Sequence, residues 1–510
     1  MAGRLGGGEA RRGAAFVLMV WVSVAGATGC SSAPGGATAD ARGGALGDGS
    51  PGGLASGDAD GAGGDGGLGL SPGQIDQVAV GRDPAAGIPA ATLQGAVAAN
   101  NAFAFELYAQ LLGDGGGLAG EGDAESRNVL TSPLSASLAL TMAYAGAAGA
   151  TATEMASVLH ADLPDGGSIF DGQNALTQAL AGRPAAALAE AQQIAPSDGA
   201  APSPSDYQLE VVNSVWGDES VSWSQDYLTR LARSYGAGVH LEDFIHAPDQ
   251  ACSAINAWVS LQTDGLIPDL LSPTAITSHT RFVLVNALHL NFPWVAKFDP
   301  SMTAPASFTR ADGSTVTATF MNQTSALPYA DDGQAQIVEL AMMGGEALVV
   351  ALPHAGSTLA AYEAYLETNA SPLPQPSQSQ NVALSIPKIS LPGTTFSLAA
   401  ALEALGLPLA FVPGGADFSR MSVPPSGSSL YISDVVQQAT WSMQENGLQA
   451  AAATAVIGYT DDIAFGQPPP PIPVTVNRPY LIEIVDAPTG AILFLGHVED
   501  PTAQASARAE

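Results

Sequence analysis

Cationic side chains are scarce in this sequence of 510 residues. It contains 16 Lys and Arg residues against 48 Asp and Glu residues, which gives a formal net charge of −32. Such a charge repels phosphate backbones and other polyanions, and it reports on solubility and partners more than on fold. The composition therefore argues against nucleic acid, anionic lipid surfaces and heparin-like polymers as partners.

Cysteine is also rare, with only Cys30 and Cys252 in the chain. Cys30 lies at the end of an N-terminal export signal, described below, and its thiol is predicted to carry a lipid. Cys252 then has no partner, so we expect no intrachain disulfide to stabilise the fold. Because its neighbours are apolar, Cys252 is predicted to be a small buried side chain.

The sequence lacks the common catalytic and cofactor motifs. It contains no G-x-S-x-G, no H-E-x-x-H, no C-x-x-C pair and no Gly-rich phosphate loop followed by Lys. Its seven His residues show no metal-ligand spacing. We therefore expect no enzyme, no metal site and no cofactor.

Residues 1–30 read as an export signal. Three arginines, Arg4, Arg11 and Arg12, precede an apolar run over residues 14–25, which is too short for the ~20 residues that span a bilayer. The following Ala27-Thr28-Gly29-Cys30 resembles a bacterial lipobox, although Leu is commoner than Ala at its first position. We expect Cys30 to anchor the protein to a membrane, at the cell surface or in the periplasm. Cleavage by ordinary signal peptidase and secretion is the alternative.

Residues 31–92 are dominated by Gly, Ala, Ser and Asp, with almost no large apolar side chain. Such a segment cannot bury enough surface to offset the entropy of ordering, so a flexible tether is predicted, with a reach of about 45 Å for about 60 residues. It either holds a domain off a membrane or is a neutral spacer. The ordered domain is expected at 93–502, with an Ala- and Pro-rich inserted loop near 182–206 and a disordered tail at 503–510.

The stretch from Gln444 to Thr454 allows two interpretations. Its alanines favour a helix. As a strand, its even positions from 448 to 454 place small or apolar side chains on one face, and Gly447 lies where the chain folds back. Downstream, Pro468–Pro471 and Pro473 predict an extended exposed loop, and Tyr480–Val485 and Ala491–Val498 predict two core strands. The exposed loop and the two core strands that follow favour the strand interpretation.

These segments resemble the serpin family. The E-N-G-x-x-A-A-A-A-T pattern from Glu445 is similar to the serpin hinge, and Val476–Leu481 is similar to the signature after the reactive-centre loop, with Tyr480 in place of the usual Phe. Further similar blocks are Asn128–Ser135, Ile255–Leu271, Leu284–Leu288 with Trp294 and Phe298, and Leu430–Ala439. The resemblance runs from about residue 96 to Pro501.

The resemblance implies an α+β fold with a large, mostly antiparallel central sheet, further sheets, about nine helices and an exposed loop. It assigns Ser132, Pro133, Asn286 and Gln437 to the shutter, the region beneath the middle of the central sheet. Trp294 belongs to the breach at the top of that sheet. The family usually carries His where this chain has Gln437.

The resemblance also implies a suicide-substrate inhibitor of serine or cysteine endopeptidases. A protease forms an acyl-enzyme with the loop, and the freed hinge then inserts into the central sheet and distorts the protease before deacylation. The expected partner is thus a target endopeptidase, and the inhibitor is expected to be a monomer. The hinge residues are Glu445, Gly447, Leu448, Ala450, Ala451, Ala452, Ala453 and Thr454.

Two points leave alternatives open. Leu448 stands where the family favours Thr or Ser, and its bulk is expected to slow insertion. Counting fourteen residues beyond Gly447 places the reactive bond at Asp461–Asp462, while the long loop makes Tyr459 or Thr460 the alternative specificity residue. The rival functions are a non-inhibitory surface-binding protein of the same fold and, suggested by the tether alone, a structural surface lipoprotein.

Overall fold

The computed structural model describes residues 74–113, 128–193, 202–368, 373–422, 430–448 and 470–503. The chain divides into Met1–Leu68 and Gly69–Glu510, and the description concerns the second unit. The predicted export signal with Cys30 lies outside the described residues. So do the later hinge positions and the candidate reactive-bond residues: Ala450, Ala451, Ala452, Ala453, Thr454, Tyr459, Thr460, Asp461 and Asp462.

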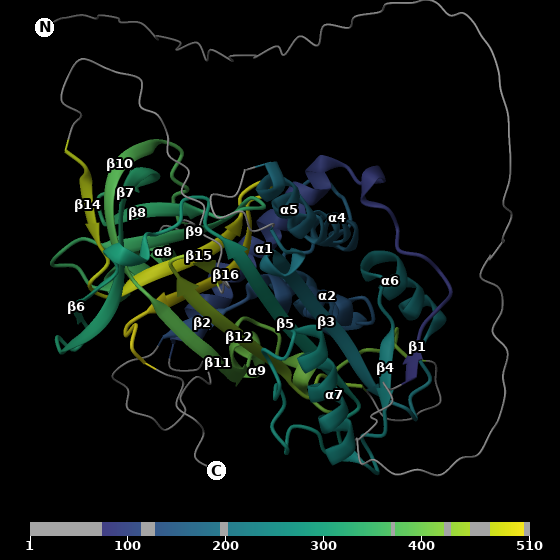
Figure 1. Cartoon of the computed structure of the whole chain (residues 1–510). Helices are drawn as coiled ribbons and strands as arrows, with labels where there is room; N and C mark the ends of the chain where they lie inside the picture. Colours follow the sequence, from purple (N-terminus) through teal and green to yellow (C-terminus); the bar gives the residue numbers. More distant parts are fainter. Residues whose placement is uncertain are drawn as a thin grey trace, which may run out of the picture. The chain divides into compact units, whose positions relative to one another are not determined.

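A seven-stranded central sheet organises the domain (Figure 1). Its order is β1 (Gln74–Asp76), β4 (Val239–Glu242), β3 (Gln208–Asp218), β5 (Phe282–Pro293), β13 (Gly447–Leu448), β12 (Val435–Gln444) and β11 (Ile389–Ser397). Strand β3 pairs parallel with β4, and β5 pairs parallel with β12, whereas the remaining pairings are antiparallel. The predicted large, mostly antiparallel sheet is confirmed.

A second sheet holds most of the remaining strands. Its order is β14 (Ile472–Thr475), β10 (Ser379–Pro387), β7 (Thr315–Asp331), β8 (Ala335–Ala341), β9 (Glu346–Pro353), β15 (Tyr480–Asp486), β16 (Ala491–Val498) and β2 (Val129–Thr131), and β6 (Ala304–Thr309) pairs with β7. All residues of β9, β15 and β16 are buried, because other elements cover both faces of these strands. The two predicted C-terminal strands are confirmed.

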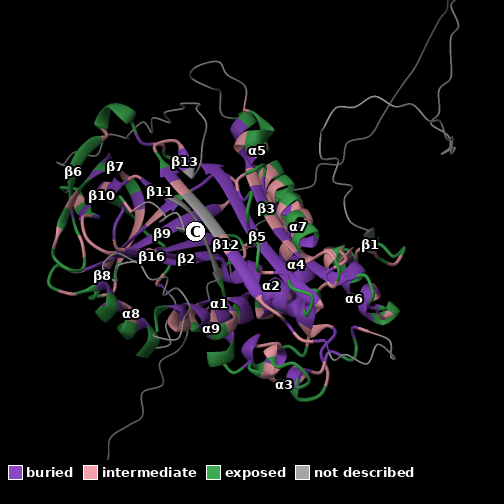
Figure 2. Cartoon of the chain, turned by 90° about the horizontal axis from the view of Figure 1, so that it is seen from below, coloured by how far each residue is buried: buried purple, intermediate pink, exposed green. Residues whose placement is uncertain are grey.

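Helices pack on these sheets (Figure 2). They are α1 (Ala90–Leu112), α2 (Pro133–Tyr144), α3 (Gly149–Val158), α4 (Ile169–Ala181), α5 (Arg183–Gln193), α6 (Gln225–Tyr235), α7 (Pro248–Gln262), α8 (Leu359–Thr368) and α9 (Ala399–Ala404). Helix α2 is buried from Pro133 to Ala143, as expected of a helix enclosed by other elements. Ser132 caps this helix and Pro133 occupies its first turn, where the missing N–H costs least. The α+β fold class is confirmed.

The predicted tether extends too far toward the domain. Residues Gln74–Asp76 form strand β1 on the edge strand β4, and α1 begins at Ala90, so the predicted boundary at residue 92 is wrong. Arg82 fixes the segment between them, because its Nε donates to Asn174 Oδ1 of α4 at 2.8 Å. Backbone pairing and one long polar side chain order this segment without the large apolar residues that the composition argument requires.

The segment predicted as an inserted loop, residues 182–206, is partly helical. Its first half forms α5, and Ala187 and Ala191 of α5 are buried four residues apart on one side of the helix. Alanine is the best helix former and leaves little side chain to accommodate, so an Ala-rich insertion can pack closely. At the other end, Pro204–Asp206 is a short 3-10 helix.

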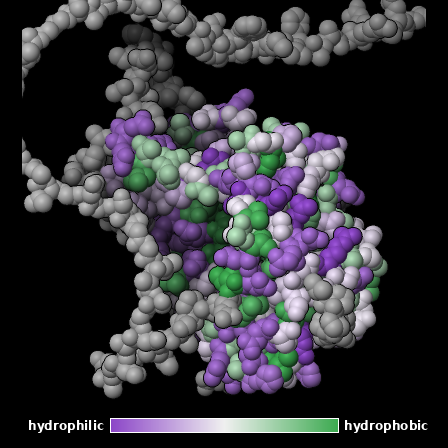
Figure 3. Space-filling view, turned by 90° about the vertical axis from the view of Figure 1, so that its right-hand side faces the viewer, coloured by the Kyte–Doolittle hydropathy of each residue, from purple (hydrophilic) through white to green (hydrophobic). Residues whose placement is uncertain are grey.

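Three expectations from composition concern the cysteine, metal ligands and membrane-spanning helices. Cys252 is free and buried, as predicted. No group of His, Cys, Asp or Glu suited to a metal ion occurs in the described ranges, and no helix there is long and apolar enough to cross a bilayer. On the face in Figure 3, hydrophobic residues occur in small groups between hydrophilic ones.

Two buried glutamates should make the protein more stable at mildly acidic pH. Burial raises the pKa of Glu346 (β9) to about 7 and that of Glu483 (β15) to about 8. The folded state therefore retains protons that the unfolded state releases above its own pKa, near 4.5. Stability is then greatest below that value and falls as pH rises through about 7 and 8. Between about pH 5.5 and 8.5 these two groups should lower the free energy of unfolding by a few kcal/mol, since each pKa unit corresponds to about 1.4 kcal/mol. Burial lowers the pKa of His240 and of His289 to about 4, so these two histidines act in the opposite direction below about pH 6.5.

Urea unfolding across this pH range would measure the slope. The E346Q/E483Q variant should show a flatter profile, because it removes both titrating groups. A stability that stays constant or rises across the same range in the unmodified protein would contradict this assignment.

Candidate functional site

The hinge enters the central sheet where β12 ends. A turn at Glu445 and Asn446 reverses the chain, and the two residues of β13 lie between β5 and β12. Gly447 is the register partner of Pro293 on one side and of Gln444 on the other, and Leu448 is the partner of Phe292 and Met443. Both pairings are antiparallel. The strand interpretation of the hinge is thus correct for Gly447 and Leu448.

The breach holds this turn through its backbone. Trp294 directly follows β5, and its indole Nε1 donates to the Gln444 carbonyl at 2.9 Å. Its backbone N donates to the Asn446 carbonyl at 3.0 Å, and the Phe298 N donates to the Glu445 carbonyl at 3.0 Å. Three consecutive carbonyls thus accept hydrogen bonds from the segment after β5. Trp294 is buried here, directly after the last residue of β5.

The Glu445 side chain adds an ion pair to the turn. Its Oε2 lies 2.7 Å from Lys388 Nζ, and its Oε1 accepts a hydrogen bond from Thr303 Oγ1 at 2.9 Å. Partial burial acts to raise the pKa of Glu445, but the bonds from Lys388, Thr303 and the backbone outweigh burial and lower that pKa. The carboxylate therefore stays ionised and paired at neutral pH.

Gly447 is required by close approach of two backbones. A Cβ at this position would lie 2.3 Å from the Phe292 carbonyl oxygen and 2.6 Å from Pro293 Cα. Contacts this short are not sustained by real side chains, so only glycine brings the hinge against β5.

The shutter is built around the amide of Gln437 in β12, which is fully buried. Its Oε1 accepts from Thr131 Oγ1 at 2.7 Å and from the Ser132 N at 3.0 Å. Its Nε2 donates to the Ser132 carbonyl at 2.8 Å and to Asn286 Oδ1 at 3.1 Å. All four hydrogen-bonding positions of the glutamine amide are thus used.

The other side of the shutter is less completely bonded. Asn286 in β5 is buried, and its Nδ2 has no hydrogen-bond partner among the described residues. Asn286 and Gln437 are register partners where β5 and β12 pair directly, from Leu284 with Val435 to Leu288 with Ala439. A buried amide N–H without a partner costs about 1–3 kcal/mol.

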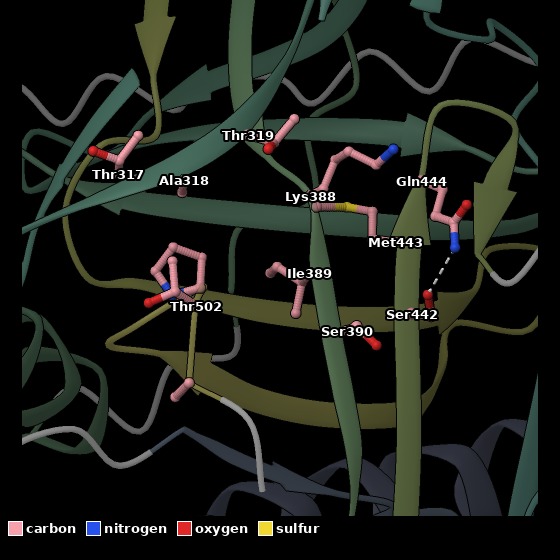
Figure 4. Close-up of a pocket in the computed structure, with 12 residues that line it drawn as sticks. Thr317, Ala318, Thr319, Lys388, Ile389, Ser390, Ser442, Met443, Gln444 and Thr502 are labelled. Carbon is pink, nitrogen blue, oxygen red and sulfur yellow. Dashed lines mark hydrogen bonds between the residues drawn. The ribbon is translucent and has the colours of Figure 1, made fainter. Parts of the chain in front are cut away.

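A pocket of about 370 Å³ lies beside the hinge turn (Figure 4). Met443 and Ile389 contribute buried apolar side chains, and Thr317, Thr319 and Ser442 contribute hydroxyl groups. Lys388, the partner of Glu445, also lines it. The residues that line the pocket include no acid–base pair suited to catalysis.

The structure brings the predicted residues into two groups. Trp294, Glu445, Gly447 and the Leu448 backbone meet at the breach, and Ser132, Asn286 and Gln437 meet at the shutter. Sequence reasoning missed Lys388, Thr303 and Thr131. One signal for Lys388 was available, because it is one of only two lysines in an acidic chain that places Glu445 in its hinge.

The sequence matches a protein family over nearly all of the described domain. Residues 98–501 match the family model described as "Serpin (serine protease inhibitor)". The chain belongs to the serpin family. Serpins are typically protease inhibitors and are generally not catalytic, and they generally bind target proteases.

Similar serpins occur in distant organisms. An uncharacterised serpin-like protein of Thermococcus kodakarensis is 31% identical over 408 residues, which cover 79% of this chain and 85% of that protein. Leukocyte elastase inhibitor A of Mus musculus is 30% identical and covers 79% of this chain and 98% of its own. The crystal structure of tengpin, a thermophilic serpin, in the native state matches with a TM-score of 0.62 at 25% identity, covering 79% of this chain and 94% of tengpin.

Proposed function

We propose that this serpin is a suicide-substrate inhibitor of serine or cysteine endopeptidases. In this mechanism a protease cleaves the loop after the hinge, and the acyl-enzyme is trapped when the hinge inserts between β5 and β12. The supporting observation is β13, because Gly447 and Leu448 already pair with both strands at the place where an inserted strand would begin.

The pairing of β13 defines the register of insertion. Continuing the antiparallel pairing with β5 places Ala450 opposite Leu290, Ala452 opposite Leu288 and Gly458 opposite Phe282, the first residue of β5. The strand available to the loop therefore ends at Gly458. Tyr459, Thr460, Asp461 and Asp462 follow directly, which agrees with a reactive bond at Asp461–Asp462 or with the alternatives Tyr459 and Thr460.

The same register brings Thr454 to the shutter. Thr454 falls opposite Asn286 on β5 and opposite Gln437 on β12. Directly opposite residues of antiparallel strands carry their side chains on the same face. The threonine hydroxyl can then accept from the partnerless Asn286 Nδ2. Insertion would thus give Asn286 Nδ2 a partner, while the bond from Gln437 Nε2 to Asn286 Oδ1 would be lost.

Insertion also improves the sheet. The single parallel ladder between β5 and β12, from Leu284 with Val435 to Leu288 with Ala439, would give way to two antiparallel ladders. Parallel pairing is slightly less stable per residue than antiparallel pairing, and the exchange adds a complete ladder. Both effects favour the inserted state and supply the free energy that distorts a bound protease.

Cleavage of the loop should therefore stabilise the protein. The chain from residue 31 is nicked with a low-specificity protease, mass spectrometry locates the cut, and Tm is compared before and after. A gain on the order of 10 kcal/mol would raise Tm by roughly 20 °C, taking about 2 °C per kcal/mol for a large domain. An unchanged or lower Tm would contradict the inhibitor mechanism and favour a non-inhibitory binding function for the same fold.

A further inference from the structure

Helix α5 packs at the end of the central sheet where the hinge enters. It follows α4 directly and contacts β3 and the 3-10 helix Pro204–Asp206 (Figure 2). Ala187 and Ala191 pack into the same buried cluster as Phe292, the register partner of Leu448. The helix is therefore attached to the half of the sheet that contains β3 and β5.

The first residue of α5 also connects it to the second sheet. Arg183 Nε donates to Asp486 Oδ1 at 2.6 Å, and Arg183 Nη2 donates to Asp486 Oδ2 at 3.1 Å. The Asp486 side chain is fully buried at the end of β15. A two-point arginine–carboxylate pair of this kind is directional and strong.

A second contact joins α5 to the turn between β8 and β9. A Cβ at Gly344 in this turn would lie 3.2 Å from Ala187 Cβ and 3.1 Å from Phe292 Cε1. The turn is bonded to the segment that ends β5, because Met343 N donates to the Pro293 carbonyl at 3.0 Å. Helix α5, the β8–β9 turn and the breach thus form one packed unit.

The shutter shows which side of the sheet has to move. Strand β12 is fixed to Thr131 and Ser132 by three of the four Gln437 bonds, whereas a single bond runs from Gln437 to Asn286 of β5. Adjacent strands lie about 4.8 Å apart, so admitting one strand moves β5 away from β12 by a further ~4.8 Å. The β3–β5 side would slide while Asp486 stays with the second sheet.

We propose that α5 is a clasp, formed by the Arg183–Asp486 pair, that resists opening of the central sheet between β5 and β12. A displacement of several ångströms breaks the two Arg183 hydrogen bonds, which span 2.6 and 3.1 Å. The inference rests on the proposed insertion mechanism for its biological meaning. The resistance to opening is a property of the uncleaved protein and can be measured without a protease.

The test variant has to remove the pair without leaving a buried charge. Replacing Arg183 alone would leave Asp486 beside Glu346, its register partner on β9, whose side chain is 1% exposed. R183M/D486N removes both members of the pair. The amide introduced by D486N keeps an acceptor oxygen for the Thr489 N, which now donates to Asp486 Oδ2 at 3.1 Å.

A second ion pair supplies a matched control. Arg310 Nε donates to Asp500 Oδ2 at 2.7 Å, the Asp500 side chain is 3% exposed, and Asp500 also accepts from the Thr502 N. Arg310 follows β6, which pairs with β7 of the second sheet. R310M/D500N therefore removes an equivalent buried arginine–aspartate pair that does not involve α5.

Amide hydrogen exchange of the intact proteins, followed by mass spectrometry, measures sheet opening. In R183M/D486N we expect amides of Leu284–Leu288 and Val435–Ala439 to exchange at least tenfold faster than in R310M/D500N. Equal exchange of these segments in the two variants would overturn the clasp. If nicking fails to raise the Tm of the unmodified protein, the proposed function fails, and the exchange ratio still decides whether α5 restrains the sheet.

Discussion

An arginine at position 448 should convert this serpin from an inhibitor into a substrate. The register places residue 448 between Phe292 and Met443, whose side chains are both fully buried in one core cluster. Position 448 already belongs to β13, so the guanidinium would expel this residue from the sheet. Insertion would then have to return it to that layer, where an unpaired charge costs several kcal/mol. Insertion then becomes slower than deacylation, and the protease is released. L448R should be cleaved without forming a stable complex.

Two measurements check this outcome. Electrophoresis in denaturant would show whether a covalent protease complex persists, and thermal melting would show whether the nicked variant loses the Tm gain of the nicked parent. Q449R is the matched control, because position 449 points to the opposite face, next to the polar Asn291 in the extended register. L448T, the residue type that the family favours, should insert at least as fast as the parent. Persistent complexes with L448R would contradict the proposed path of insertion.

The strands near the hinge could be predicted from sequence because their determinants are local. Gly447 marks the close approach to β5, and the two apolar runs after the prolines form β15 and β16. Ser132 and Pro133 together begin α2, where a capping hydroxyl and a first-turn proline act over only a few residues. Such signals do not depend on the rest of the fold.

The remainder of the site depends on tertiary contacts that no local pattern encodes. Lys388 reaches Glu445 across 57 positions of sequence, and Arg183 reaches Asp486 across 303. Composition predicted a tether where backbone pairing orders the chain without side-chain burial. Strand β1 is an example, because its residues pair with β4 although the neighbouring sequence resembles a linker. The ordered domain therefore begins before the boundary at residue 93 that composition favoured.

Glutamine at position 437 was the clearest departure of the shutter from the family pattern, and the structure gives it a specific consequence. A neutral histidine offers one donor and one acceptor, whereas Gln437 uses two of each. We expect Q437H to lose part of the network. Q437L should lose all of it and leave the Thr131 hydroxyl, the Ser132 N–H and Asn286 Oδ1 without this partner.

The intact proteins should therefore melt in the order unmodified, Q437H, Q437L, from the highest Tm to the lowest. Each buried group that loses its hydrogen bond costs about 1–3 kcal/mol, so Q437L should lose about 4 kcal/mol, or roughly 10 °C in Tm. Exchange of the β5–β12 amides should follow the reverse order, because Gln437 Nε2 makes the side-chain bond from β12 to Asn286 of β5. S442A, also in β12 but with its side chain at the pocket rim, controls for substitution in the strand.

If Q437H opens as slowly as the unmodified protein, the fourfold bonding of the amide does not set the barrier to insertion. Faster opening in Q437H would instead mean that glutamine makes the native sheet harder to open than histidine would. Gln437 would then slow the entry of the hinge through the bonds that hold β5 against β12. Leu448 is already paired in β13, so the hinge positions that still have to enter the sheet begin after it.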